Sequence, residues 1–270
     1  MALFLGKSMS ATEWRAPSHE HERKTLTCPC HRNSRWFACV KRLGIACLLL
    51  AFLLPPSQAM AAGGAHIVDD SEVETPGVCH LETWVTRFIP GDGYLNLAPA
   101  CTAEKMPFLE IGAAYQHYWD QTINAELFGP AFKINFQPET KGVGVGLGLN
   151  AGTNLRTGEL GLASLIGLVT IPIDPKVKIN LNAGWSYLKG DVPNALFWGG
   201  QFEAKVAWDV SLMVEVFGRA PNGLVGTQMG LRYTPTMNGR EGWLDFDLLA
   251  GSYFDSVSSR FFTLGVTVRY

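Results

Sequence analysis

The sequence lacks any apolar run long enough to cross a lipid bilayer as an α-helix. Its longest apolar run is residues 43–54, whereas a helical span needs about 20 consecutive apolar residues. Charged residues are also scarce, at 17% of the 270 positions, and the mean hydropathy is only +0.09. Soluble domains usually carry more charge than this. The composition therefore excludes a helical membrane protein and departs from that of an ordinary soluble domain.

The short apolar run is typical of an export signal. Lys41 and Arg42 precede it, two prolines follow it, and residues 57–61 end in the pattern Ala-Met-Ala. A basic start, a short apolar core and an A-x-A ending define a secretory signal peptide. We expect cleavage after Ala61, so that residues 1–61 form a removed N-terminal extension and signal peptide. Because residues 1–39 are unusually polar for such a signal, we expect translation to begin at Val40.

Motifs for metal binding or catalysis are equally scarce. Cys28, Cys30, His31 and Cys39 lack the second ligand pair that zinc-finger spacings require. Residues 62–270 contain three histidines, and none lies in a metalloprotease motif or beside a serine as a catalytic base. We therefore expect no enzyme activity, no cofactor and no metal. An outer-membrane lipid-modifying enzyme remains a weaker alternative.

The charge balance after cleavage argues against nucleic acid as a partner. Residues 62–270 hold 14 Lys+Arg and 21 Asp+Glu, a formal net charge of −7. Proteins that bind nucleic acid carry basic patches that neutralise phosphates. An acidic exported chain is instead suited to the outside of a cell.

Two cysteines remain after cleavage, Cys79 and Cys101. An even number in an oxidising compartment predicts a disulfide. The turn signal of residues 90–93 lies between them, flanked by strand-like sequence. Because a hairpin at this turn brings residue 79 close to residue 101, we expect the bridge to join the first two strands.

The dominant pattern after residue 79 is alternation of apolar and polar residues. In residues 177–187, for example, Val177, Ile179 and Leu181 alternate with Lys178 and Asn180. Twelve such segments follow, at residues 80–88, 94–102, 106–118, 122–136, 142–151, 158–172, 176–188, 195–208, 210–218, 224–233, 243–251 and 260–270. Their lengths suit tilted strands that cross a bilayer, and several exceed the five or six residues usual in sandwich strands. The sequence predicts an all-β, antiparallel up-and-down transmembrane barrel of about twelve strands.

The last strand carries the clearest alternation. Its apolar positions end at an aromatic C-terminal residue: Phe262, Leu264, Val266, Val268 and Tyr270. This pattern resembles the signal by which outer-membrane barrels are recognised by the barrel-assembly machinery. The last strand must also pair with the first, because an open sheet edge is not tolerated in lipid.

If the apolar face meets lipid, the polar face lines the lumen. The candidate lumen-lining residues are Glu82, Glu110, Glu126, Lys133, Glu159, Lys178, Glu203, Lys205, Glu215, Arg232, Asp245, Asp247 and Arg269. One interpretation is that these charges pair across strands and fill a narrow lumen, since unpaired buried charge is costly. The other is a small hydrophilic passage with a weak preference for cations or neutral solutes. In residues 122–136 the polar positions change phase near Gly129-Pro130, which predicts a β-bulge there.

The segment that precedes the first strand resembles a known family. Residues 66–71 read His-Ile-Val-Asp-Asp-Ser, and residues 75–84 read Thr-Pro-Gly-Val-Cys-His-Leu-Glu-Thr-Trp. This stretch resembles the opening of the outer-membrane transporters of the "MetA-pathway of phenol degradation" family, with His80 where Gln is usual and the cysteine pair added. The resemblance covers residues 66–84 and implies a barrel that passes small hydrophobic or aromatic compounds.

Together these patterns predict a protein of the bacterial outer membrane. We expect residues 62–78 to form a periplasmic N-terminal segment and residues 79–270 to form the barrel. The expected function is a passive channel for small solutes, with outer-membrane lipid and the assembly machinery as partners. The alternative is a structural or interaction barrel whose lumen is plugged. The sequence does not identify the solute.

Overall fold

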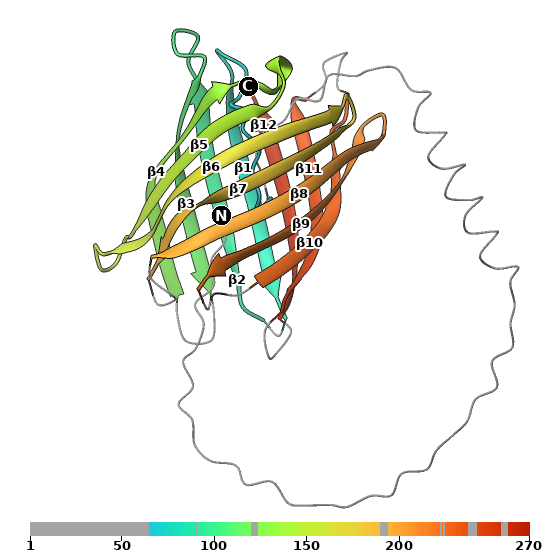
Figure 1. The fold of residues 1–270 in the computed structure, drawn as a ribbon. Helices are drawn as coiled ribbons and strands as arrows, with labels where there is room; N and C mark the ends of the chain where they lie inside the picture. Colours follow the sequence, from blue (N-terminus) through green and yellow to red (C-terminus); the bar gives the residue numbers. More distant parts are fainter. Residues whose placement is uncertain are drawn as a thin grey trace, which may run out of the picture. The chain divides into compact units, whose positions relative to one another are not determined.

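The computed structural model describes residues 65–89, 91–119, 124–189, 194–221, 223, 225–236, 242–254 and 259–270 (Figure 1). The expected signal peptide and its cleavage site after Ala61 lie outside the described residues. Among the residues described, no helix has the length and apolar character needed to span a membrane.

Twelve antiparallel strands close into one barrel, which confirms the predicted fold. Each strand pairs with its neighbours in the sequence, and β1 closes the ring against β12. The strands are β1 (Cys79–Phe88), β2 (Gly93–Thr102), β3 (Leu109–Trp119), β4 (Asn124–Gln137), β5 (Gly144–Asn154), β6 (Leu160–Asp174), β7 (Val177–Leu188), β8 (Ala195–Ala207), β9 (Val210–Ala220), β10 (Val225–Tyr233), β11 (Leu244–Tyr253) and β12 (Arg260–Arg269). A short 3₁₀ turn, η2 (Glu139–Lys141), lies between β4 and β5. The strands run obliquely around the barrel (Figure 1).

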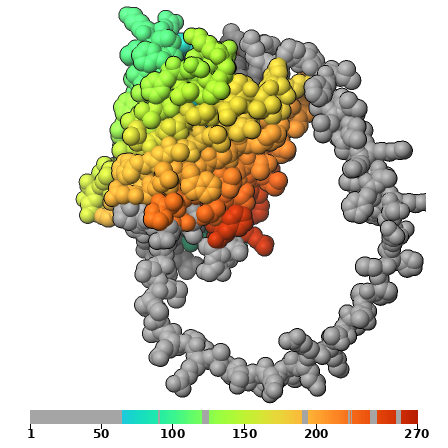
Figure 2. All heavy atoms as spheres, viewed as in Figure 1, coloured from blue at the N-terminus to red at the C-terminus, as the bar shows by residue number. Residues whose placement is uncertain are grey.

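The alternation in the sequence separates an apolar outer face from a polar interior. In β12, Phe262 is 52% exposed while its neighbour Thr263 is 1% exposed. Large apolar side chains are exposed in the same way along the other strands, including Leu181, Leu248 and Val216. Figure 2 shows the side chains of β5–β9 covering one side of the barrel as a continuous surface. An apolar outside around a polar inside is the arrangement of a barrel that lies in a membrane, and the protein is a bacterial outer-membrane β-barrel.

The closing contact between β1 and β12 follows from the alternating C-terminal sequence. The two strands pair from His80 with Arg269 to Phe88 with Phe261. Cys79 N donates to Tyr270 O at 3.0 Å, and Tyr270 N donates back to Cys79 O at 2.9 Å. The first and last strands therefore leave no open edge where they meet. The role of this strand in recognition by the assembly machinery stays a prediction.

The structure confirms the disulfide between Cys79 and Cys101. The two residues lie directly opposite each other in the β1–β2 ladder, with their Cα atoms 4.0 Å apart. The bridge thus joins the first hairpin at the end of the barrel where β12 also finishes.

We expect loss of this bridge to lower the heat stability of the barrel. In the chain-entropy description, a disulfide that closes a loop of this length stabilises the folded state by about 3 kcal/mol. The variant Cys79→Ser with Cys101→Ser should therefore unfold at a lower temperature than the oxidised protein. Heat-modified mobility in gel electrophoresis measures this shift. A reductant should lower the unfolding temperature of the original protein and leave the double variant unchanged.

The expected β-bulge at Gly129-Pro130 is absent. The β3–β4 pairing runs without a break from Leu109 opposite Ile134 to Trp119 opposite Asn124. The register of β4 instead shifts against β5 between Asn135 and Gln137, close to the end of the strand. The odd-numbered residues of β4 therefore face the interior from Ala125 to Asn135. Glu126 is even-numbered and so faces outward, as described below.

Candidate functional site: the barrel lumen and its N-terminal segment

Residues 65–74, which we call the lumen segment, lie inside the barrel. Ala65, Val68, Ser71 and Glu74 are all buried. The backbone N–H of Ser71 donates to Thr170 Oγ1 on β6 at 2.9 Å, and Asp69 N donates to Asn182 Oδ1 on β7 at 2.8 Å. An extended segment without a sheet of its own thus satisfies its polar backbone with side chains of the barrel wall.

Glycines in the wall make room for this segment. A Cβ atom on Gly199 would lie 2.6 Å from Val68 Cγ2, and one on Gly265 would lie 2.9 Å from Ala65 Cβ. A Cβ on Gly146 would lie 2.9 Å from Ser71 O, and one on Gly144 would collide with Ser71 Oγ. Because any side chain at these positions overlaps the segment, glycine is needed here for close approach.

Two acidic residues of the segment pair with two lysines of the wall. Lys133 Nζ on β4 lies 3.0 Å from both Asp69 Oδ1 and Asp70 Oδ1. Lys178 Nζ on β7 lies 3.5 Å from Asp70 Oδ2 and 3.4 Å from Glu203 Oε2. Burial alone would raise the pKa of Asp70, but the charges of Lys133 and Lys178 outweigh it and hold the pKa well below its usual range. Asp70 therefore stays ionised at neutral pH.

His66 anchors the start of the segment to the opposite wall. Its Nδ1 lies 2.7 Å from Glu215 Oε1, and its Nε2 lies 3.6 Å from Asp247 Oδ1, just beyond hydrogen-bond distance. The backbone N–H groups of Ile67 and Val68 donate to the other oxygen of Glu215, at 3.1 and 3.3 Å. Burial lowers the pKa of the imidazole, but the carboxylates of Asp247 and Glu215 outweigh this and raise the pKa to about 9. His66 is thus a cation at neutral pH.

The wall residues around His66 are themselves paired. Gln201 and Gln228 donate to the two oxygens of Glu215, at 2.6 and 2.8 Å. Arg232 donates to both oxygens of Asp247, at 2.8 and 3.0 Å. Since Arg232 stays charged at any ordinary pH, His66 is the group of this cluster that titrates in the mildly alkaline range.

We expect alkaline pH to loosen the lumen segment. A pKa raised from 6.5 to about 9 means that the stabilisation is complete below about pH 6.5 and is lost as the pH rises through about 9. The free energy by which protonation of His66 stabilises the bound segment is about 3 kcal/mol in full. Cleavage of the lumen segment by an added protease, relative to a reference substrate, should therefore become faster between about pH 7 and about pH 10. In His66→Gln the segment should be cleaved more readily at neutral pH and lose this dependence; an identical pH profile in both proteins would contradict the assignment.

The end of the segment is fixed next to the first strand. Arg269 Nε on β12 donates to Glu74 Oε2 at 2.6 Å, and Arg269 Nη1 donates to Asp245 Oδ2 at 2.9 Å. Glu74 N donates to Glu110 Oε2 on β3 at 2.8 Å. The segment therefore contacts the wall on several sides, from β3 and β4 round to β12.

The structure places most of the candidate lumen residues inside the barrel. Those that are buried there are Glu82, Lys133, Lys178, Glu215, Arg232, Asp245, Asp247 and Arg269. Glu110 and Glu203 reach the segment and Lys178, as described above. Lys205 is half-buried near the end of β8.

Two candidates lie elsewhere. Glu126 stands between the buried Ala125 and Leu127 and faces outward, where its Oε1 lies 3.7 Å from His117 Nδ1. The reason is the missing bulge, since continuous pairing of β4 fixes the outward parity of residue 126. Glu159 lies in the turn between β5 and β6, where it is exposed and pairs with Lys189.

An aromatic cluster occupies the end of the barrel away from Cys79 and Tyr270. Phe261 packs on Phe88 and Tyr253 with ring centroids 5.5 and 5.4 Å apart, and Tyr253 packs edge-on to Phe217 at 5.7 Å. These rings come from inward positions near the ends of their strands. The interior is thus charged around the segment and aromatic beyond it.

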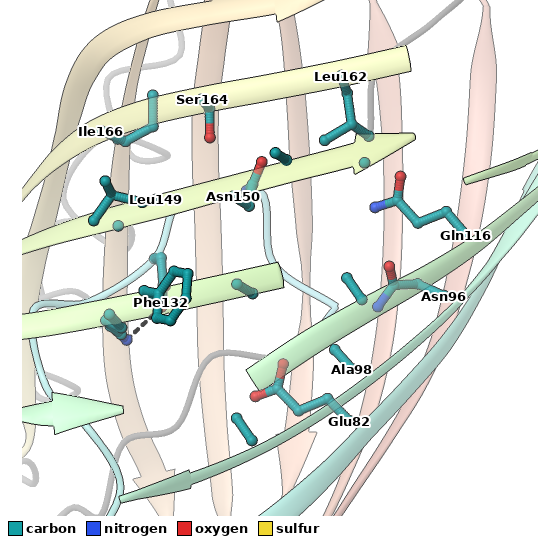
Figure 3. A pocket seen from close by; sticks show the side chains of 18 of the residues that line it. Glu82, Asn96, Ala98, Gln116, Phe132, Leu149, Asn150, Leu162, Ser164 and Ile166 are labelled. Carbon is teal, nitrogen blue, oxygen red and sulfur yellow. Dashed lines mark hydrogen bonds and ion pairs between the residues drawn. The ribbon is translucent and has the colours of Figure 1, made fainter. Parts of the chain in front are cut away.

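A cavity of about 200 Å³ remains beside the lumen segment (Figure 3). Its boundary consists of His66, Ile67 and Asp69 on the segment and of residues of β1–β8 on the wall. Small side chains on neighbouring strands leave this space: Ala98, Ala114, Ala131 and Gly148. Glu82, Asn96, Gln116, Asn150 and Ser164 supply its polar lining (Figure 3).

Solved structures share this barrel fold. The KdgM porin aligns with a TM-score of 0.55 at 6% identity, covering 70% of this chain and 98% of that chain. A structure described as the KdgM porin in complex with disordered oligogalacturonate gives 0.54 at 7% identity, with the same coverage. The NanC porin gives 0.51 at 10% identity, again covering 70% and 98%. At these identities the likeness establishes the fold, which is that of a twelve-stranded outer-membrane porin.

The sequence itself identifies the family. No curated protein matches the chain in sequence. The family model that matches is not that of the phenol-degradation transporters, which the residues at 66–84 resemble, so that resemblance does not define the family. The match extends over residues 50–270 and so includes all twelve strands and the lumen segment. The chain belongs to the family described as "Uncharacterised conserved protein UCP029691".

Proposed function

We propose that this protein is a passive outer-membrane channel for small solutes, closed at rest by its own lumen segment. The observation that carries the proposal is the way the segment is held. His66, Asp69, Asp70 and Glu74 contact the wall through ion pairs and hydrogen bonds. Such contacts are readily exchanged for water when a segment moves, whereas an apolar core resists hydration.

The polar wall around the segment supports a solute path. If the segment leaves, the charged and amide side chains that it contacts line a hydrophilic lumen. Glu82, Glu110, Glu203, Glu215, Asp245 and Asp247 then outnumber the lysines and arginines Lys133, Lys178, Arg232 and Arg269. An acidic lining favours cations and neutral solutes over anions. No cofactor takes part, because movement down a gradient needs none.

The porin fold fits this proposal. One of the similar structures is titled as a porin in complex with disordered oligogalacturonate, and a solute path through the present barrel agrees with that likeness. The carboxylates around the cavity of the present barrel are unsuited to a polyanion. Passage of hydrophobic or aromatic compounds, as the phenol-degradation resemblance implies, has less support, because amides and carboxylates such as Asn96, Asn150 and Glu82 lie among the apolar side chains of the cavity lining.

A closed structural or interaction barrel is the second candidate. It is favoured by the aromatic cluster at the end away from Cys79, which fills the interior there. On this alternative, surface loops would act and the lumen would stay shut. An outer-membrane enzyme has weaker support, since the fold is that of porins and no catalytic motif is present in the sequence.

The remaining assignments complete the proposal. Residues 1–61 are an extension and signal peptide removed on export, and the end of the barrel that holds Cys79 and Tyr270 faces the periplasm. Residues 62–78 form the N-terminal segment on that side, and residues 65–74 of it enter the lumen from there. The barrel-assembly machinery recognises β12 through Phe262, Leu264, Val266, Val268 and Tyr270.

The test is single-channel recording of protein purified from outer membranes, with swelling assays on liposomes that contain it. Discrete conductance steps and solute-dependent swelling are expected, with cations favoured over anions. A folded, heat-modifiable barrel that stays silent under voltage, alkaline pH and mild denaturant would instead support the closed structural barrel.

A further inference from the structure

Unpartnered polar atoms gather on the wall of the cavity beside the lumen segment. Asn96 on β2 is 1% exposed, and neither atom of its amide has a hydrogen-bond partner among the residues that the structure describes. Asn150 Oδ1 on β5 and Ser164 Oγ on β6 are buried and unpartnered in the same sense. A buried polar group without a partner costs about 1–3 kcal/mol, so several at one cavity indicate that the cavity holds water or a polar ligand that pairs with them.

These groups lie on two pairs of strands that β4 separates. Asn96 lies directly opposite Gln116 in the β2–β3 ladder, and Asn150 lies directly opposite Ser164 in the β5–β6 ladder. On β4, the small Ala131 lies opposite Asn150, and Leu127 lies opposite Gln116. Figure 3 shows the amides of Asn96 and Gln116 on one side of the space and Asn150 and Ser164 on the other.

The hydrogen-bonding character of the four groups defines the chemistry of a ligand. An amide nitrogen donates, an amide oxygen accepts, and the Ser164 hydroxyl does both. A ligand that satisfies them must carry donors and acceptors close together, as adjacent hydroxyl groups do. An aromatic hydrocarbon or a phenol offers too few such groups, and its binding would leave buried amides unpaired.

The charges around the cavity exclude an anion. Glu82, Glu110 and Asp69 contribute to its lining. Lys133 is also part of the lining, but its ammonium group already lies 3.0 Å from both Asp69 and Asp70. His66, the other cation of the lining, already pairs with Glu215 at 2.7 Å. An anionic ligand would thus meet carboxylates while both cations of the lining are engaged with carboxylates of the protein, which is unfavourable at low dielectric.

Size and apolar surface complete the description. A cavity of about 200 Å³ holds the liquid volume of about seven water molecules. That volume suits one small ring and is too small for a chain of rings. Trp84, Ile166 and Leu168 contribute apolar surface to the lining, against which the carbon face of such a ring can pack.

We propose that this cavity is a binding site for a small neutral polyhydroxylated solute of monosaccharide size, in which Asn96, Asn150 and Ser164 supply the hydrogen bonds. The proposal rests on the proposed channel function and specifies its solute class. The site lies against His66, Ile67 and Asp69, so a bound solute contacts the lumen segment that closes the barrel.

The test measures equilibrium binding and flux separately on protein purified from outer membranes. Calorimetric titration uses D-glucose as the neutral probe, D-glucuronate as the anion of the same ring, and phenol as the aromatic probe. Binding of glucose should be saturable, and glucuronate and phenol should bind at least about tenfold more weakly. Asn96→Leu and Ser164→Ala should each weaken glucose binding by about tenfold, the effect of one lost hydrogen bond.

Thr102→Val provides the matched control. The Thr102 hydroxyl is also buried and unpartnered among the described residues, but Thr102 does not line the cavity. Its loss should leave glucose binding unchanged. Heat-modified gel mobility confirms that each variant is folded, and Ser164→Ala, the smaller change, replaces Asn96→Leu if that variant does not assemble.

The outcomes separate this proposal from the channel itself. Glucose flux into liposomes without saturable binding, or binding that Asn96→Leu and Ser164→Ala leave intact, would overturn the binding site and leave the channel standing. Tighter binding of phenol or glucuronate than of glucose would also overturn it. Saturable glucose binding without flux supports the site and contradicts the channel function.

Discussion

A variant that lacks residues 66–73 is expected to conduct ions in larger steps, and to be open for far more of the time, than the intact protein. Those residues occupy the lumen and contact wall residues from Lys133 on β4 to Asp247 on β11, so their removal replaces packed protein with water. Glu74 is retained because its carboxylate pairs with Arg269 at 2.6 Å and holds the approach to β1. Single-channel recording should show several-fold larger conductance steps.

The deletion also removes the counter-charges of buried wall residues. Lys133 and Lys178 lose Asp70, and Glu215 loses His66. Lys178 keeps Glu203, and Glu215 keeps Gln201 and Gln228, whereas Lys133 loses both Asp69 and Asp70. Lys133 is tolerated in this state only if water enters, since an unpaired buried charge is costly. We therefore expect a barrel that still assembles and remains heat-modifiable, but unfolds at a lower temperature. Unchanged conductance in a folded deletion variant would show that the segment does not close the lumen.

A point substitution tests the same idea without removing any residue. Gly199→Leu places a side chain where Val68 lies, because even a Cβ there would be 2.6 Å from Val68 Cγ2. This variant should resemble the deletion. Gly200→Leu is its matched control: the adjacent glycine faces the other side of the strand, and its Cβ would meet only an ordinary contact of 3.6 Å with Leu181. Equal opening in the two variants would point to a general weakening of β8.

The fold was predictable because lipid outside and water inside impose alternation on every strand. Residues 177–188 illustrate this, since the expected strand at 176–188 and β7 (Val177–Leu188) coincide within a residue. The disulfide was equally predictable, because a hairpin turn at 90–93 sets residue 79 opposite residue 101. Strand ends were less predictable. The strand expected at 106–118 begins at Leu109, because residues 106–109 form a turn in which Leu109 N donates to Met106 O.

The interior was predictable in composition and not in arrangement. Alternation identifies Asp247 and Arg232 as inward-facing, and their direct opposition in the β10–β11 ladder places the two together. It does not reveal that His66 inserts between Glu215 and Asp247, because nothing in a periodic pattern assigns a preceding extended segment to the lumen. The available signal was the pair Asp69-Asp70 together with the glycines at 144 and 146. Acidic residues before the first strand indicate a segment that pairs with basic residues of the wall. Glycines in the wall indicate the space into which that segment packs.

The errors at Glu126 and Glu159 have local causes. For Glu126, polar residues at both odd and even positions of β4 predict a bulge, whereas an outward glutamate near the end of a strand can pair with His117 at the rim. For Glu159, the β5–β6 turn lies later in the chain than expected, at residues 155–159 instead of 152–157, with Asn154 Oδ1 accepting from Arg156 N at 2.9 Å. An asparagine that accepts from the backbone two residues later is a turn former, and it moves Glu159 out of the strand.

Asp70→Asn is expected to release the lumen segment and to shift the channel toward anions. Asp70 is the carboxylate shared by Lys133 and Lys178, at 3.0 and 3.5 Å. Removing one member of a buried ion network costs about 3–5 kcal/mol. We expect the lower end of this range, because Asp69 still pairs with Lys133 and Glu203 still pairs with Lys178. A loss of about 3 kcal/mol changes the ratio of released to bound segment by more than about a hundredfold.

The selectivity of the released state follows from the same charges. When the segment is displaced, Lys133 and Lys178 no longer pair with Asp70 and become exposed to the solute path. Because these added positive charges attract anions, the permeability to chloride relative to potassium should rise. Reversal potentials in a salt gradient measure this ratio, and the open fraction at neutral pH measures the release. Asp174→Asn is the control, since it removes the same charge from an exposed position near the β6–β7 turn and should change neither quantity. If Asp70→Asn stays as closed as Asp174→Asn, the ion pairs of Asp70 do not hold the segment, and closure must depend on the packing of Val68 and Ala65 against the wall glycines.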